Sequence, residues 1–243
     1  MQNDLAVALV HLGERETALK YFQAIEKNQP GLYRTAANMG TTYELLGDNP
    51  NALRWIRKGL DRNAESHAGS EWIHLRILEA KIAGKTTSVL GLDFGDAARP
   101  KNPPSLPKNA RGGAQTLAQV EDALIVQLHE RLPFTSVPLN DPIVASLLFD
   151  LGNCLALRGD HAGAAAVYQK ALDFRPKNRT LVQSRLDAAL GKMPLATRIA
   201  LAALMLGAIG AGGTIWRKRH ENAALARVQF LEETPEKGAI KTR

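Results

Sequence analysis

The sequence predicts an all-α protein in which a solenoid of helical hairpins is followed by one transmembrane helix. Three observations lead to this prediction. Residue types repeat at an interval of 34, a charge-free stretch runs from 199 to 216, and only 5% of the 243 residues are aromatic. Because 45% of the residues are hydrophobic and 23% are charged, the chain can bury an ordinary core and does not have the composition of a disordered polypeptide.

The repeat places residues of the same kind at the same position in successive copies. Gly13 is followed by Gly47 and Ala18 by Ala52 after 34 positions, and a third copy lies 112 residues beyond the second. Each copy has apolar residues three and four positions apart on either side of a glycine and an acidic residue, which is typical of two amphipathic helices joined by a turn. We expect the turn glycine to adopt the left-handed conformation that ends a helix, and the alanine to let the two helices approach closely.

Two further glycines, Gly40 and Gly152, occupy equivalent positions in the first helices of the second and last copies. We expect them to allow close packing between neighbouring hairpins. The pattern as a whole resembles the tetratricopeptide repeat, a 34-residue helix-turn-helix unit, and the resemblance is clearest over 150–176. Three such units cover about 40% of the chain. Because the first unit lacks the start of its first helix, we expect the chain to be truncated at its N terminus.

The remaining segments follow in order. We expect tetratricopeptide-like units and the first helix of a divergent unit, at 69–83, within residues 1–83. A Pro- and Gly-rich insertion follows at 84–115, with the displaced second helix of that unit at 116–134. The best-matched unit spans 141–177, and a capping helix spans 179–192. On this last helix we expect four polar residues to face water: Arg179, Gln183, Arg185 and Asp187.

Residues 195–216 are long and apolar enough to span the hydrocarbon layer of a membrane once. The basic cluster at 217–219 directly follows Trp216, which favours a cytoplasmic tail and extracytoplasmic repeats. We expect the basic tail, 217–243, to be disordered. Four of the seven net positive charges lie beyond Pro194, and this distribution argues against a nucleic-acid-binding face. A stripe of small residues in the membrane segment is a candidate homo-oligomer contact: Ala203, Gly207 and Ala211.

The sequence contains no combination of residues that predicts an enzyme, a metal site or a cofactor. Asp93, Phe94 and Gly95 match the metal-binding tripeptide of protein kinases, but the other kinase motifs are missing. We therefore expect 89–94 to be a short extended segment tucked against the solenoid. The six histidines lack the spacing of metal ligands. Glu71 and His74, three residues apart, are expected to form a solvent-exposed pair.

The resemblance to tetratricopeptide proteins implies a concave groove, lined by the first helix of each unit, that binds a peptide or protein partner. The residues that would line it are Arg34, Ala37, Asn38, Thr41, Glu44 and Leu45 of the second unit, and Ser146, Phe149, Asp150 and Asn153 of the last. The sequence therefore favours a non-catalytic, membrane-anchored scaffold. Two alternatives remain open: an accessory subunit in envelope assembly or secretion, and a fragment of a larger enzyme whose catalytic domain is absent.

Overall fold

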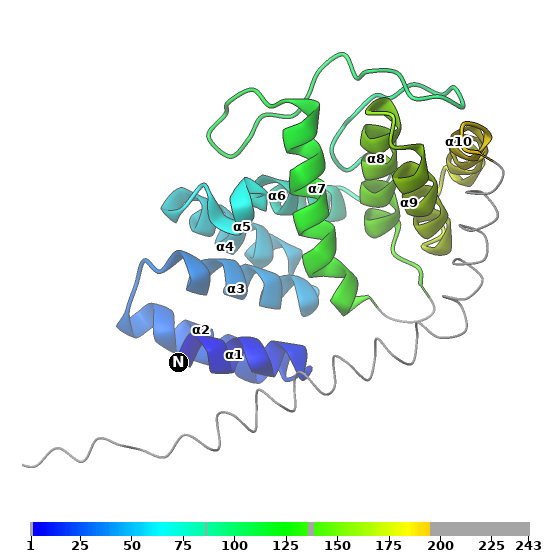
Figure 1. Ribbon diagram of the computed structural model, residues 1–243. Helices are drawn as coiled ribbons and strands as arrows, with labels where there is room; N and C mark the ends of the chain where they lie inside the picture. The colour runs from blue at the N-terminus through cyan, green and yellow to red at the C-terminus, as the bar shows by residue number, and fades with distance from the viewer. Residues whose placement is uncertain (1, 86, 136–138, 195–243) are drawn as a thin grey trace, which may run out of the picture. The chain divides into compact units, whose positions relative to one another are not determined.

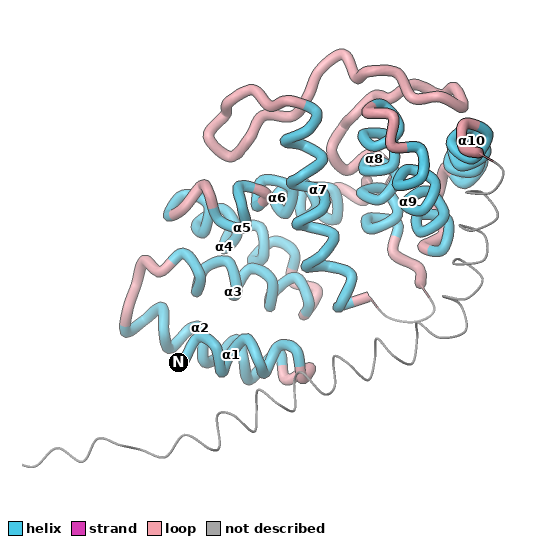
Figure 2. The backbone as a smooth tube through the Cα atoms, in the orientation of Figure 1, coloured by secondary structure: helices cyan, strands magenta, loops and turns pink. Residues whose placement is uncertain are grey.

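The computed structural model describes residues 2–85, 87–135 and 139–194, and these residues form helices and loops without a strand (Figures 1 and 2). The all-α prediction is therefore confirmed for the described part of the chain. The helices are α1 (Gln2–His11), α2 (Arg15–Asn28), α3 (Tyr33–Leu45), α4 (Asn49–Arg62), α5 (Ser66–Gly69), α6 (Glu71–Ile82), α7 (Leu117–Arg131), the 3-10 helix η1 (Leu132–Phe134), α8 (Pro142–Leu157), α9 (His161–Asp173) and α10 (Arg179–Gly191).

The predicted transmembrane helix at 195–216, its small-residue stripe and the tail at 217–243 lie outside the described residues. Among the helices that the structure describes, none combines the length and the hydrophobicity needed to cross a membrane.

Three pairs of consecutive helices pack as hairpins: α1 with α2, α3 with α4, and α8 with α9. In the second and last hairpins the two helices approach closely because a glycine faces a large side chain. A Cβ atom at Gly40 would lie 2.6 Å from Ile56 Cγ1, and one at Gly152 would lie 2.5 Å from Tyr168 Cε1. These contacts correct the sequence-based expectation, because both glycines allow close approach within their own hairpin rather than between neighbouring hairpins.

Replacing Gly152 with alanine should lower the free energy of unfolding by about 1 to 3 kcal/mol, since the new methyl group would overlap the buried ring of Tyr168. Gly191, the last residue of α10, is the matched control, because a Cβ atom there would meet nothing within 4 Å. Gly191→Ala should leave stability unchanged or raise it by about 0.5 kcal/mol. Urea unfolding followed by circular dichroism measures both, and equal effects would contradict the close approach.

The turns inside the second and last hairpins follow the glycine and acid pattern of the repeat. Gly47 and Gly159 both have φ 84°, which confirms the left-handed conformation expected at the end of the first helix. The next residue caps the second helix: the Asp48 side chain accepts a hydrogen bond from the Asn51 amide, and the Asp160 side chain accepts one from the Gly163 amide. The repeated dipeptide thus ends one helix and starts the next.

The middle of the chain departs from this regular pattern. Helix α6 packs against α4, and α7 packs against α8 and, to a smaller extent, against α6. The loop between α6 and α7 runs past α8 toward α10 before it returns to the start of α7 (Figure 2). The backbone between α4 and α6 is also irregular, because His67 and Ala68 adopt left-handed φ values of 51° and 54°.

Residues of four helices build the core of the N-terminal part. Phe22 of α2, Met39 of α3 and Trp55 of α4 belong to one buried cluster, together with Ala6 and Val10 of α1. Trp55 therefore fills space between the first and second hairpins. At the other end, Val182, Leu186 and Ala189 form the buried side of α10, which packs against α9.

Candidate functional site

The inner face of α8 carries the four residues that the sequence assigns to the groove of the last unit. We define the α8 face as Ser146, Phe149, Asp150 and Asn153, which lie on one side of the helix because they are three or four residues apart. Their exposed fractions are 6%, 8%, 3% and 0%. The structure therefore brings all four residues together but does not leave them open to solvent.

A non-helical segment of the same chain, residues 89–97, which we call the strap, meets the α8 face at Ser146 and, through Arg185, at Asn153. The Val89 amide donates a hydrogen bond to Ser146 Oγ at 3.3 Å. The apolar side chains of the strap are no more than 7% exposed: Val89, Leu90, Leu92 and Phe94. The expectation that this segment is tucked against the helices is confirmed.

Arg185 of α10 joins the strap to the α8 face. Its Nη2 group donates to the carbonyl oxygens of Phe94, at 3.0 Å, and Gly95, and its Nε group donates to that of Ala97 at 3.2 Å. Its Nη1 group donates to Asn153 Oδ1, and the guanidinium lies 5.2 Å from the centroid of a ring of the α8 face, that of Phe149.

With 1% of its surface exposed, Arg185 is buried, and the prediction that it faces water is wrong. Its hydrogen-bond partners in the strap lie about 90 residues earlier in the chain. Because the polar pattern of α10 alone contains no information about these partners, the sequence could not reveal this role.

The kinase-like tripeptide builds the turn that Arg185 holds. Asp93 Oδ1 accepts a hydrogen bond from the Gly95 amide at 2.8 Å, and Gly95 has a left-handed φ of 73°. Phe94 points into the protein with 3% of its surface exposed, while Lys101 forms an exposed ion pair with Asp93 at 3.3 Å. The residue types of the tripeptide therefore have a structural reason in this chain: a side-chain acceptor, an apolar anchor and a left-handed turn.

Two polar groups of the α8 face remain unsatisfied beneath the strap. Asp150 Oδ2 and Asn153 Nδ2 are buried and have no hydrogen-bond partner among the described residues. Asn153 Oδ1, in contrast, accepts from Tyr168 Oη at 2.7 Å as well as from Arg185. Burial raises the pKa of Asp150 to about 8, and the positive charge of Arg185 offsets this only in part.

Asp150 should therefore make stability fall as the pH rises. An unfolded aspartate loses its proton near pH 3.9, whereas folded Asp150 keeps it up to about pH 8, so the folded state is penalised progressively across this interval. Asp150→Asn should raise the free energy of unfolding by about 2 kcal/mol at pH 8 and by much less at pH 4. Urea unfolding at both values checks this, with exposed Asp187→Asn as control. A gain that does not depend on pH would contradict the assignment.

The groove residues predicted in the second unit all lie on α3, but not all of them face solvent. Arg34 is exposed, and Asn38 and Thr41 are half-buried. Ala37, in contrast, is 4% exposed and packs against α4 at Gly59, and Leu45 packs against the N-terminal core. That any of these residues contacts a partner stays a prediction.

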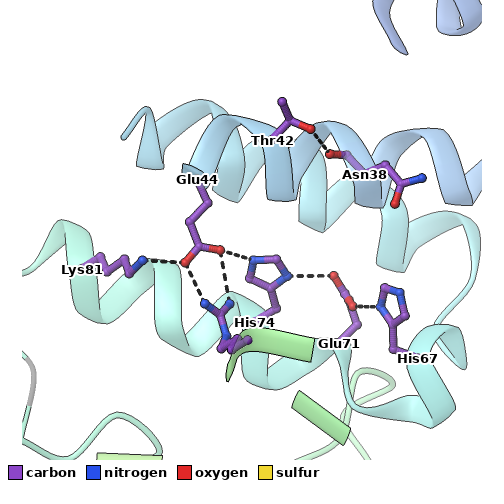
Figure 3. A network of polar contacts seen from close by, with 8 residues as sticks. Asn38, Thr42, Glu44, His67, Glu71, His74 and Lys81 are labelled. Carbon is purple, nitrogen blue, oxygen red and sulfur yellow. Dashed lines mark hydrogen bonds and ion pairs between the residues drawn. The ribbon is translucent and has the colours of Figure 1, made fainter. Parts of the chain in front are cut away.

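Glu44, the sixth predicted groove residue of α3, lies at the centre of a charged network (Figure 3). Its carboxylate accepts from Lys81 Nζ at 2.6 Å, from His74 Nε2 at 2.6 Å and from both terminal nitrogens of Arg131 at 2.9 and 3.2 Å. Only 6% of the side chain is exposed. Burial alone would raise the pKa of Glu44, but Arg131 and His74 outweigh it and hold the pKa well below its usual range.

The network continues along α6 toward the irregular junction at His67. His74 Nδ1 contacts Glu71 Oε1 at 3.1 Å, and the other carboxylate oxygen of Glu71 contacts His67 Nδ1 (Figure 3). Glu71 is 1% exposed and His74 6%, so the prediction of a solvent-exposed pair is wrong. Burial would raise the pKa of Glu71, but hydrogen bonds from the two histidines lower it to about 2.

The network ties helices together rather than lining an open cavity. Glu44 comes from α3, His74 and Lys81 come from α6, and Arg131 comes from α7, so one carboxylate connects three helices. No group of three or more histidine, cysteine or acidic residues in the described segments is arranged to hold a metal ion. The only feature of the sequence that indicates this network is the presence of ionisable residues, such as Glu71 and His74, among the apolar residues of α6.

Residues 145–178 match the family model of the tetratricopeptide repeat. The matched stretch covers most of α8, all of α9 and the turn before α10, so the predicted resemblance is confirmed for this unit. No curated protein matches the chain.

Proposed function

We propose that this chain is a non-catalytic scaffold that binds a protein or peptide partner through its helical repeats and is anchored in a membrane by 195–216. Tetratricopeptide repeats commonly mediate protein-protein interaction, and the match over 145–178 supports the binding role. The membrane anchor rests on the length and apolar character of the segment.

The observation that carries the binding role is the strap on the α8 face. The α8 face of one repeat helix already holds a non-helical stretch of polypeptide: Ser146 Oγ accepts a hydrogen bond from its backbone, and Arg185 of α10 donates to its carbonyl oxygens. This arrangement supports the proposal that the repeats bind peptides.

The open part of α3 is the surface that we assign to an external partner. Arg34, Asn38 and Thr41 retain accessible side chains there, and polar or charged groups at such positions set specificity. A photo-crosslinking amino acid in place of Thr41 should capture a partner in intact cells. The same amino acid at Arg57, which is exposed on α4, is the matched control. Equal capture at both positions, or capture at neither, would contradict the assignment.

Membrane anchoring and orientation need a separate test. We propose that the repeats are extracytoplasmic and the tail cytoplasmic. With Cys154 replaced, a single cysteine at Ala162, which is exposed on α9, should react with an impermeant reagent in intact cells, and one at Thr234 should not. Reaction at Thr234 alone would reverse the orientation, and a chain that stays in the membrane fraction after deletion of 195–216 would refute the anchor.

A further inference from the structure

We propose that the strap is an exchangeable internal ligand, and that the α8 face binds a non-helical peptide of a partner that repeats the apolar spacing of the strap and takes its place. The inference rests on the proposed binding function and gives it a second site, with a defined ligand chemistry. Three features of the strap support it: its polar contacts are made by its backbone, it leaves polar groups of the α8 face without partners, and it lies in a loop between two helices.

The polar contacts that hold the strap are made to its backbone. Ser146 Oγ accepts from one strap amide, that of Val89, and Arg185 donates to three strap carbonyls, those of Phe94, Gly95 and Ala97. Because every peptide offers such groups, these contacts select for backbone conformation and not for side chains. Selectivity is left to the buried apolar positions, which in the strap are 89, 90, 92 and 94.

The strap runs along α8 in the direction of the helix. Its first residue, Val89, meets Ser146, and its turn at Phe94 and Gly95 is joined through Arg185 to Asn153, two turns further along α8. This direction defines the register in which a competing peptide would lie. The first apolar residue of the peptide would take the place at Ser146, and its last would take the place of Phe94.

The strap does not satisfy the surface that it covers. Asp150 Oδ2 and Asn153 Nδ2, on the same face of α8 as Ser146, are buried without partners among the described residues. A buried polar group without a hydrogen bond is costly. A peptide that offers a donor to Asp150 would therefore bind better than the strap itself, which is what an exchangeable occupant requires.

The strap can also leave without unwinding a helix. It lies in the loop between α6 and α7, whose described residues from 87 to 116 form no helix, and the residues on both sides of it, Ser88 and Ala98, are exposed. As a tethered segment it acts at an effective concentration on the order of millimolar, so a free peptide competes poorly until the strap is weakened.

A strap-weakened protein tests the proposal directly. The probe is a fluorescent synthetic peptide with the sequence of residues 87–98, and the protein is the full chain in detergent. The double variant Leu92→Ser and Phe94→Ser removes two of the four apolar anchors. The matched control replaces two exposed residues of the same insertion, Arg99→Ser and Lys108→Ser. We expect the strap-weakened protein to bind the peptide at least about tenfold more tightly than the wild type or the control.

Cys154 reports whether the rest of the fold is intact. Its thiol is fully buried, and burial raises its pKa to about 12, so it should stay unreactive as long as α7 and α8 remain packed. A strap-weakened protein with an unreactive Cys154 that binds the peptide no more tightly than the wild type would overturn the proposal. So would equal binding of a peptide in which the two residues corresponding to Leu92 and Phe94 are serine.

If Cys154 reacts, the double variant has opened the fold, and the wild type is used instead. Hydrogen exchange of the strap amides is then followed during titration with the peptide up to millimolar concentration. Faster exchange in the strap, with unchanged exchange in α8, supports replacement. Unchanged strap exchange at the highest concentration overturns it. Because the crosslinking test at Thr41 uses a different helix, partner binding at α3 can succeed while the exchange of the strap fails.

Discussion

Replacing Arg185 with alanine should lower the free energy of unfolding by about 3 kcal/mol or more. The variant leaves the buried Asn153 Oδ1 and the carbonyl oxygens of Phe94 and Gly95 without their charged donor, and it removes the group that stacks on Phe149. Urea unfolding followed by circular dichroism gives the value, and hydrogen exchange of residues 89–97 should accelerate.

Arg179 provides the matched control on the same helix. It is exposed and donates one hydrogen bond, to the Leu172 carbonyl at 3.3 Å. Its replacement by alanine should cost less than about 1 kcal/mol. If the two variants lose the same stability, Arg185 does not hold the strap to the α8 face, and the account of the site is wrong.

Glu44→Gln should have an effect of similar size, a loss of about 3 to 5 kcal/mol, because it leaves the charges of Arg131, Lys81 and His74 without their common carboxylate. Glu79 of α6 is the control. It pairs with Arg57 and Arg76 at the surface, with 40% of its side chain exposed, and Glu79→Gln should cost no more than about 1 kcal/mol. Comparable losses for both variants would contradict the role of Glu44 in holding α3, α6 and α7 together.

The stabilisation that this network contributes should weaken both as the pH falls and as the pH rises. The pKa values of Glu44 and Glu71 are lowered in the folded state, so their contribution is present above about pH 4.3 and is lost as the pH falls. The pKa of His74 is raised, mainly by Glu44 against the opposing effect of burial, so its contribution is full below about pH 6.5 and is lost as the pH rises. The difference in stability between the wild type and Glu44→Gln should therefore be largest between these values.

The repeats could be predicted from the sequence because their determinants are local. Gly40 and Gly152 allow close helix contact, and Gly47 and Gly159 end helices, all within a single hairpin. An interval of 34 residues therefore contains the information needed to recognise a unit. The interval does not specify which side chain packs on each glycine, so the expectation that Gly40 and Gly152 face a neighbouring hairpin is wrong.

The candidate site could be predicted only in part, because its contacts join distant segments. The sequence places Ser146, Phe149, Asp150 and Asn153 on one helix face, but it does not reveal that residues 89–97 cover that face. The sequence predicts that Arg185 faces solvent and that Glu71 belongs to an exposed pair, because charged residues of an amphipathic helix are expected on its solvent side. Arg185 has its partners in the strap, far away in the sequence. Glu71 does contact its near neighbours His67 and His74, but His74 also contacts Glu44 of α3, and this distant contact is what the sequence does not reveal.

The distances in sequence that these contacts span have a consequence for how the chain folds. In an ordinary repeat array each unit touches only its neighbours, so order can spread from any point. Here Arg131 reaches Glu44 across 87 residues, and Arg185 reaches Phe94 across 91. Loops of that length must close before either contact forms, which slows the search. We therefore expect the backbone amides of the N-terminal and C-terminal hairpins to become protected from hydrogen exchange together, in one late and cooperative step. They should not become protected one hairpin after another from one end of the chain.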